Sequence, residues 1–317
     1  MPDYPDEILS GTPSPHQLLA LSTHWQQVLD SPVDVLVLDK EARGSSSLFR
    51  YRCCGMGLPR GSVMEGPDDL LVCSPELCFL QLAGKLDLEE LVHLGFELCG
   101  VYAPPRPGTM RLLSRAAPLC TIESLGTLLA QMPRARGVAR ARRALAHVIE
   151  MSASPMESVQ AMLFCMPRRL GGMGIPRARL NAAVEFDAQA RKISGGKTRA
   201  VCDMLWPGLA VEYEGRIFHE GEASLKRDRA RSNALAHMGI RTISVYDEHI
   251  RSVEKTWAIG AEIARAAGFR LRPRDYDETQ RCLRLRGAIL RSPTGTAEPM
   301  WPGTREGLPS LEDVLGK

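Results

Sequence analysis

The sequence predicts an α/β protein whose C-terminal part is a mixed β-sheet flanked by helices. From Ser154 onward, the apolar patterns follow the order helix, three strands, helix, strand, helix. Gly and Pro residues punctuate these segments at the expected turns. The predicted strands are 180–186, 199–205, Leu209–Glu214 and Arg241–Tyr246, and the predicted helices are 155–166, 223–238 and 252–267. Residues 188–197 are expected to form a polar loop between the first two strands.

The N-terminal part is predicted to be a small α+β domain, residues 14–110, behind a flexible tail at 1–13. It has a helix at 15–29, strand candidates at 33–38, 48–53 and 70–73, and helices at 75–83 and 86–98. Ser74 and Pro75 fit the N-cap and the first helical position. A basic helical connector, 111–153, carries helices at Ile122–Gln131 and 137–150, and the sheet domain spans 154–270. Residues 271–317, rich in Pro, Gly and Arg, are predicted to be poorly ordered, apart from a short helix at 308–315.

Composition narrows the class of protein. The chain has 317 residues, 44% of them hydrophobic and 24% charged, which is typical of a soluble globular protein. Nine cysteines lie in apolar surroundings without C-x-x-C spacing, which favours reduced thiols in a cytoplasmic protein over disulfides or zinc. The N-terminus lacks the apolar core of a signal peptide, and no apolar run reaches the ~20 residues of a membrane span.

Three acidic residues are predicted to converge at a β-hairpin. Pro207-Gly208 separates two strand-like runs and is a turn signal. If these two residues form the loop, Asp203 lies directly opposite Glu212, and alternation along the strand places Glu214 on the same face. Opposed Cβ atoms lie about 5 Å apart, so the three carboxylates would repel one another. A hard divalent cation, Mg²⁺ or Mn²⁺, is the natural counter-charge.

A second interpretation of the hairpin stays open. Carboxylates are common on solvated hairpin faces, and Arg199 and Arg216, on the same face, are able to neutralise them. Pro-Gly is also not the most favoured two-residue hairpin loop, so the register is itself a prediction.

Other charged residues also have two interpretations. Glu157 stands three residues after Ser154, so a capping box at the helix start explains it without catalysis. Two helices are rich in basic residues, and each is either a solvated face or a phosphate-contacting face. The candidate DNA-binding residues are Arg140 and Arg143 on the first helix and Lys226, Arg227, Arg229 and Arg231 on the second.

These motifs resemble a known family. The segments SPMES, VCDMLWPGLAVEYEG and KRDRARSNALAHMGIRTISVY, with a His between the last two, are similar to the DUF559 endonuclease-like domain and to very-short-patch-repair nucleases of the PD-(D/E)XK superfamily. The resemblance covers 154–268 and implies a restriction-endonuclease-like fold. The region around SPELCFLQLA is similar, more weakly, to AbiEi-type antitoxin regulators.

The resemblance assigns roles to particular positions. Asp203 and Glu212 match the metal-binding acids of the second and third core strands, and Glu157 matches the acid of the first helix. Glu214 occupies the position of the motif Lys in the superfamily, and this branch of the superfamily has an acid there. His219 matches the His after the acidic run, with one extra residue of spacing, and is the best candidate for a general base by residue type; a surface His beyond a strand end is the alternative.

The function implied is Mg²⁺-dependent hydrolysis of DNA phosphodiester bonds, in phage defence or DNA repair of a bacterial cell. Because the motif Lys is missing, Lys226 or a second metal would have to compensate. The alternative is a non-catalytic DNA-binding regulator or antitoxin-like protein with a degenerate nuclease fold. DNA is the expected partner, with a protein partner for the N-terminal domain and no membrane.

Overall fold

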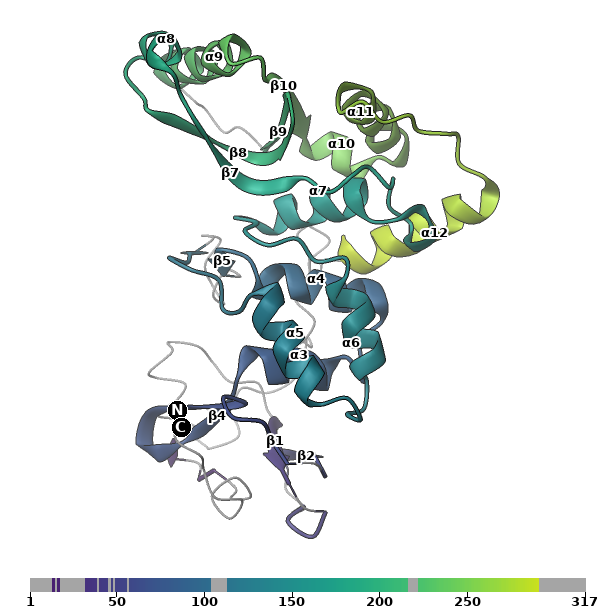
Figure 1. The fold of residues 1–317 in the computed structure, drawn as a ribbon. Helices are drawn as coiled ribbons and strands as arrows, with labels where there is room; N and C mark the ends of the chain where they lie inside the picture. The colour runs from purple at the N-terminus through teal and green to yellow at the C-terminus, as the bar shows by residue number, and fades with distance from the viewer. Residues whose placement is uncertain are drawn as a thin grey trace.

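The computed structural model describes residues 13–14, 16–17, 32–38, 40–44, 47, 49–55, 57–103, 113–215 and 222–290, except the side chains of 222–225. The chain runs from small two-stranded sheets, through a group of helices, to a larger sheet with its own helices (Figure 1). The predicted 1–13 tail and the helix at 15–29 lie almost entirely outside the described residues, and the helix at 308–315 lies wholly outside them.

The C-terminal part contains a four-stranded mixed sheet, which confirms the α/β prediction at this level. Its strands are β7 (Arg179–Glu185), β8 (Arg199–Trp206), β9 (Leu209–Glu214) and β10 (Arg241–Tyr246). Their order across the sheet is β10-β9-β8-β7. β7–β8 and β8–β9 are antiparallel, whereas β9 and β10 run parallel and are linked through a helix. That linkage is the usual way to join parallel neighbours.

The predicted hairpin register is confirmed for the pairs next to the turn. Trp206 lies opposite Leu209, and Met204 lies opposite Val211. Pro207 and Gly208 are therefore the two loop residues. Gly208 has φ of +74°, a conformation that suits a residue without Cβ. Its carbonyl accepts a hydrogen bond of 2.9 Å from the backbone N–H of Arg241, which ties the turn to β10.

Helices cover both faces of this sheet. α7 (Pro155–Cys165) lies on one face, and α8 (Ala188–Ile193) and α9 (Glu222–His237) lie on the other (Figure 1). The predicted polar loop at 188–197 is wrong for its first six residues, which form α8. Asp187 explains the helix, because its side chain accepts the N–H of Ala190 at 2.7 Å as an N-cap.

In the described residues of the N-terminal part, short strands combine with helices. β1 (Val33–Val37) pairs in parallel with β2 (Phe49–Cys53), and β3 (Val63–Glu65) pairs antiparallel with β4 (Leu71–Cys73) around the 3-10 turn η1 (Pro67–Asp69). β5 (Tyr102–Ala103) and β6 (Leu113–Ser114) form a third small sheet. The helices include α3 (Pro75–Leu82), α4 (Leu88–Leu98), α5 (Ile122–Gln131) and α6 (Val138–Leu145).

Two details of these helices follow from side-chain hydrogen bonds. The hydroxyl of Ser74 accepts the N–H of Leu77 at 3.3 Å, so the predicted N-cap of α3 is confirmed. α6 ends at Leu145, short of the predicted 150. Arg177 donates to the carbonyls of Ala146 and Val148, which satisfies acceptors that a longer helix would have bonded internally.

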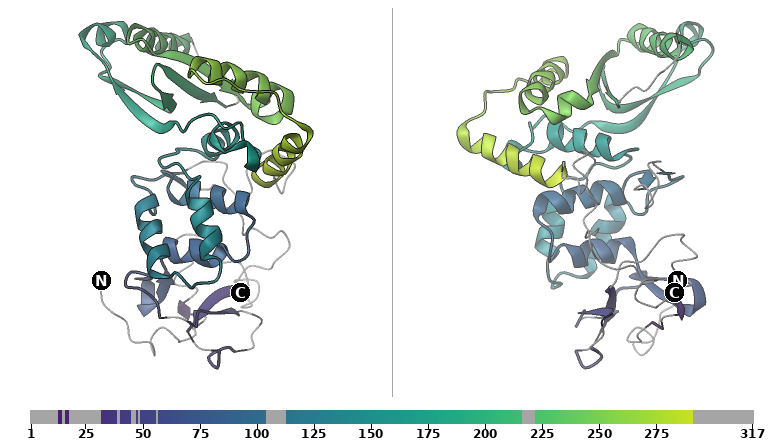
Figure 2. Two further views of the ribbon diagram at one scale, coloured as in Figure 1. Left: turned by 45° about the vertical axis from the view of Figure 1, so that its right-hand side comes forward. Right: turned by 180° about the vertical axis from the view of Figure 1, so that it is seen from behind.

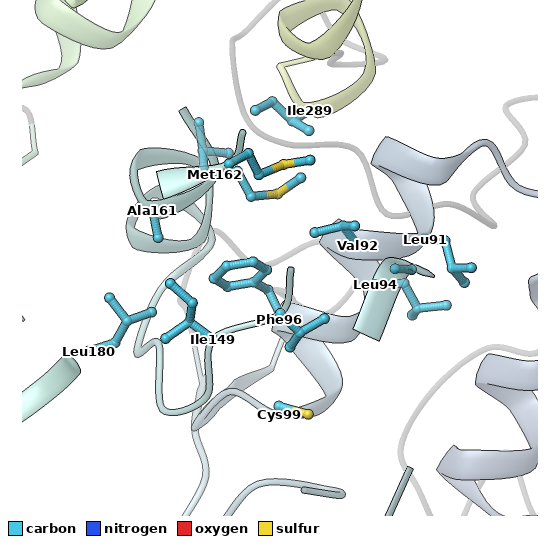
Figure 3. Packing of buried hydrophobic residues seen from close by; sticks show 14 of the residues in the cluster. Leu91, Val92, Leu94, Phe96, Cys99, Ile149, Ala161, Met162, Leu180 and Ile289 are labelled. Carbon is cyan, nitrogen blue, oxygen red and sulfur yellow. The ribbon is translucent and has the colours of Figure 1, made fainter. Parts of the chain in front are cut away.

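One hydrophobic cluster runs through both parts of the chain. It includes buried side chains from α3 to α7, from β8 to β10 and from the C-terminal helices. Figure 3 shows Val92 of α4, Met162 of α7 and Ile289 near the end of the chain facing one another. The cluster contains buried residues on both sides of the boundary predicted at 153, and the boundary predicted at 110 lies outside the described residues. A smaller cluster lies between the sheet and α8 and α9, and it consists of Phe186, Ala190, Ala200, Cys202, Ala210, Ala234 and Leu235.

The end of the described chain is helical, so the prediction of disorder from 271 is wrong up to residue 290. After α10 (Asp247–Arg251) and α11 (Val253–Ala266), α12 (Tyr276–Ile289) packs against α4, α7 and the short helix η2 (Arg168–Leu170) (Figure 2). Arg286 of α12 is buried and donates to the carbonyls of Ile250 and Arg251 at the end of α10. Among the described residues, no helix has the length and apolar character needed to cross a bilayer.

Candidate functional site

Three acidic side chains from three different elements meet beside the sheet. Glu157 comes from the first turn of α7, Asp203 from β8 and Glu212 from β9. Glu157 and Glu212 are 8% and 6% exposed, and Asp203 is half-buried. Their charges act on one another, because Asp203 and Glu212 both contribute to the raised pKa of Glu157. The structure therefore brings together three of the sequence-predicted acids.

Asp203 occupies a local irregularity in β8. Cys202 and Met204 are two residues apart in β8. Cys202 packs in the cluster under α9, whereas Met204 packs in the main core. In an undisturbed strand these two side chains would share a face. The β7–β8 ladder also omits the Asn181–Asp203 pair, and Asn181 has φ of +48°. Such irregularities re-aim side chains, and they occur often next to active sites.

Beyond the last backbone pair of β8 and β9, the carboxylate of Asp203 hydrogen-bonds to the backbone of β9. Its Oδ2 accepts the backbone N–H of Tyr213 at 2.7 Å, one residue beyond Glu212. The register predicted Asp203 directly opposite Glu212; the described ladder ends at Met204–Val211, and Asp203 contacts the residue that follows Glu212. The bond also fixes the carboxylate at the edge of the gap between β8 and β9.

Glu157 has the capping function that its position predicted, with one difference. Ser154 is the N-cap, and its hydroxyl accepts the N–H of Glu157 at 3.2 Å. The carboxylate does not return to Ser154 as in a full capping box. Its Oε2 instead accepts the N–H of Ala153 at 2.7 Å. This bond leaves Oε1 with capacity for another partner, because a carboxylate offers about four lone-pair positions.

Arg231 of α9 supplies a positive charge to the acids. Its Nη2 lies 2.7 Å from Glu212 Oε1, and it also donates to the carbonyl of Val201. The sequence assigned neutralisation to Arg199 and Arg216; Arg199 is exposed at the start of β8, and Arg216 lies outside the described residues. Two roles were predicted for Arg231, a contact to DNA and, from the family resemblance, a structural or supporting role; its guanidinium is held inside the site. Because Glu212 lies on β9 and Arg231 on α9, no local sequence pattern indicated that they form an ion pair.

A single guanidinium does not compensate for three buried carboxylates. Burial is the main cause that raises the pKa of Glu157, to about 7, and the charges of Asp203 and Glu212 add to it. Burial also raises the pKa of Asp203 and of Glu212, against the opposing effect of Arg231. The cluster therefore carries excess negative charge, and a further cation would stabilise it.

Gln160, one turn along α7 from Glu157, is a buried polar residue that the sequence analysis missed. Its amide nitrogen lies 3.2 Å from the sulfur of Met204, and its Oε1 has no hydrogen-bond partner among the described residues. A polar residue at a core-facing helix position was the available signal. An unsatisfied buried acceptor beside the acids adds to the polarity of this side of the sheet.

Glu214 is placed differently from the other acids. It lies at the end of β9, opposite Tyr246 of β10, and lines an open hollow of about 710 Å³ with Arg251 and Lys255. The three acids whose mutual effects on pKa the structure gives are Glu157, Asp203 and Glu212, and the place of Glu214 in the predicted trio stays a prediction.

The remaining predicted residues lie away from the acids or outside the description. His219 is outside the described residues. Lys226, Arg227 and Arg229 are exposed on the outer part of α9. On α6, Arg140 and Arg143 are exposed, and Arg140 donates to the carbonyl of Leu86 at 2.6 Å.

The acids fit Mg²⁺ or Mn²⁺ by chemistry, since both ions prefer carboxylate oxygens. In the part of the chain that the structure describes, however, no three His, Cys, Asp or Glu residues are already arranged to hold a metal ion. Arg231 takes the position of a counter-ion at Glu212. Movement of this guanidinium would free Glu212 Oε1 for a metal.

No family model matches the chain, and no curated protein or solved structure is significantly similar to it.

Proposed function

We propose that this protein is a Mg²⁺-dependent endonuclease that hydrolyses DNA phosphodiester bonds. The observation that carries the proposal is the convergence of Glu157, Asp203 and Glu212, which are buried together with one guanidinium. Burying carboxylates in excess of cations is costly for stability, and such groups are concentrated at functional sites. Phosphodiester hydrolysis is a reaction for which clustered carboxylates are used, because they hold the metal that binds the phosphate.

The resemblance to DUF559 and very-short-patch-repair nucleases supports this proposal. It assigned an acid to the first helix, the second strand and the third strand, and these are the positions of Glu157, Asp203 and Glu212. Apart from the short helix α8, the observed order α7-β7-α8-β8-β9-α9-β10 agrees with the order predicted from the motifs. We therefore propose the restriction-endonuclease-like fold as the finer description of the mixed sheet.

In this proposal each residue has a distinct task. Asp203 and Glu212 would hold the ion, which supplies Lewis acidity and lowers the pKa of a bound water. Glu157, with its pKa near neutrality, is suited to hold or release a proton at Oε1. Arg231 would provide the positive charge that Lys gives in the superfamily motif, because Glu214 stands at the Lys position.

A non-catalytic DNA-binding regulator is the second candidate, and one observation favours it. The ion pair of Arg231 with Glu212 gives the acidic cluster an internal cation. If this pair persists in solution, Arg231 replaces the metal and the fold binds DNA without cutting it. Weaker likeness of the N-terminal region to AbiEi-type regulators points the same way.

A nicking assay separates the two candidates. Supercoiled plasmid is incubated with the full chain in Mg²⁺, Mn²⁺ or EDTA, and relaxed product is quantified. We expect metal-dependent relaxation that is lost in Asp203→Ala and retained in Glu185→Ala, an exposed carboxylate of the neighbouring strand. DNA binding without relaxation in either metal would support the regulator. Relaxation that persists in purified Asp203→Ala would reject this metal site.

A further inference from the structure

A second charged surface lies away from the acids, where α6 meets the segment between η2 and β7. It carries four arginines and one histidine, and we call it the basic patch. Its members are Arg142, Arg143, His147, Arg169 and Arg177. Only Arg143 was among the sequence-predicted DNA-binding residues. The others come from two sequence regions, so the patch exists only in the folded chain.

Contacts and electrostatics link the members of the patch, since Arg142 and Arg177 line one groove and Arg177 donates to carbonyls at the end of α6. Burial is the first cause that lowers the pKa of His147, followed by the charges of Arg169, Arg177 and Arg143. Three guanidiniums from α6, η2 and the strand approach thus act on one imidazole. This imidazole reports a positive local potential.

Among the residues that the structure describes, no carboxylate pairs with the arginines of the patch. Arg142 donates to the carbonyl of Leu129 at 2.8 Å, and Arg177 donates to two carbonyls at the end of α6. Carbonyl oxygens carry no net charge, so both arginines retain their full charge.

A groove between α5 and α6 adjoins the patch. It has a volume of about 480 Å³, and Arg142 and Arg177 line it together with Gly126. Glu150 is the carboxylate nearest along the chain, and its Oε1 accepts the backbone N–H of Ile122 at the groove. This carboxylate is thus engaged by a backbone N–H and forms no ion pair with the arginines of the patch among the described residues.

We propose that the basic patch binds the phosphate backbone of DNA. Clustered guanidiniums match phosphate oxygens in charge and in hydrogen-bond geometry. The patch exposes no aromatic side chain for base stacking, which favours contact with backbone over bases. The inference rests on the proposed function in taking nucleic acid as the substrate, and it assigns the contact to a surface separate from the acids.

The test measures binding without cleavage. Anisotropy of a fluorescein-labelled DNA duplex is titrated with the full chain in EDTA at several salt concentrations. The test variant is Arg143→Gln/Arg169→Gln, since neither side chain has a hydrogen bond to lose among those of the described residues. The matched control is Arg241→Gln/Arg265→Gln, two exposed arginines that both pair with Glu262. Thermal melts of both variants verify folding.

We expect the test variant to bind about 10-fold more weakly, with the slope of log K against log salt reduced by about 2, because two phosphate contacts are lost. The control should bind as wild type. Wild-type affinity and slope in the folded test variant would overturn the proposal. The proposal would also be overturned if the wild-type chain bound polyglutamate but not DNA. That result would identify an acidic protein as the partner instead.

The outcomes for the patch and for the nuclease are independent. A chain that nicks DNA but binds it equally with and without Arg143 and Arg169 would reject the patch and leave the proposed function intact. A chain that shows patch-dependent binding but never nicks would reject the nuclease and leave the patch intact.

Discussion

Replacing Arg231 with glutamine removes the guanidinium that is bonded to Glu212, and it tests the central electrostatic argument. The Glu212 side chain is 8% exposed and that of Arg231 is 24% exposed. Breaking a buried ion pair on one side costs about 3–5 kcal/mol, and partial exposure of Arg231 reduces this. We therefore expect Arg231→Gln to lower the free energy of unfolding by about 2–3 kcal/mol at neutral pH.

Urea denaturation with a double-mutant cycle provides the measurement. The double variant Arg231→Gln/Glu212→Gln removes the unpaired charge and should recover much of the loss, giving a coupling energy of about 2 kcal/mol. Arg227→Gln is the matched control, because Arg227 is exposed on the same helix. It should change stability by less than about 0.5 kcal/mol.

The same variant tests competition between the guanidinium and a metal. If Mn²⁺ binds where Arg231 now lies, it should raise the melting temperature of Arg231→Gln more than that of wild type. Equal losses in Arg231→Gln and Arg227→Gln, or equal Mn²⁺ effects on variant and wild type, would refute the argument.

Three further predictions concern other parts of the molecule. The pKa of Glu157 is raised from 4.5 to about 7, so this carboxyl alone costs wild type about 3 kcal/mol of stability as pH rises across this window. The pKa values of Glu97, Asp203 and Glu212 are also raised, so Glu157→Gln should still lose stability, but less than wild type by about that amount, as urea denaturation at each pH will show. Arg286→Met should lose about 2–3 kcal/mol and expose α12 to limited proteolysis, whereas Arg284→Met, on the exposed side of the helix, should not. Gly208→Ala should cost about 1 kcal/mol in thermal melts because φ is positive there, and Gly57→Ala, with open space and no such φ, should be neutral.

The parts of the fold that were predictable from sequence are those with strong local signals. Pro207-Gly208 between two β-rich runs gave the hairpin and its register, and the Leu209–Glu214 strand has the predicted bounds. Ser74 and Ser154 gave helix starts for the same reason, because an N-cap depends on residues close in sequence.

Other features depended on contacts that no local pattern encodes. The kink that turns Asp203 toward Glu212 involves Asn181 on another strand, and the partner of Glu212 comes from α9. Glu214 lies two residues after Glu212 on β9, and it lines a hollow with Arg251 and Lys255 that no local pattern indicated. Tertiary packing, not propensity, decides these positions.

α12 was missed although its sequence carried a signal. Asp275 and Glu278 form a capping box, and apolar residues at 282, 285 and 289 follow helical spacing. The many arginines in this segment favoured a prediction of disorder over a helix with these apolar positions. Arg168 explains how so basic a helix is held, because its guanidinium bonds Glu278 and two carbonyls before the helix.

The position of α12 has a consequence for biosynthesis. A ribosome delivers a chain from its N-terminus, so the strands that carry Asp203 and Glu212 emerge well before Tyr276. Until Leu285 and Ile289 are synthesised, the apolar sides of α4 and α7 that α12 covers remain exposed to solvent. A nascent polypeptide therefore contains its acids before its hydrophobic core is complete.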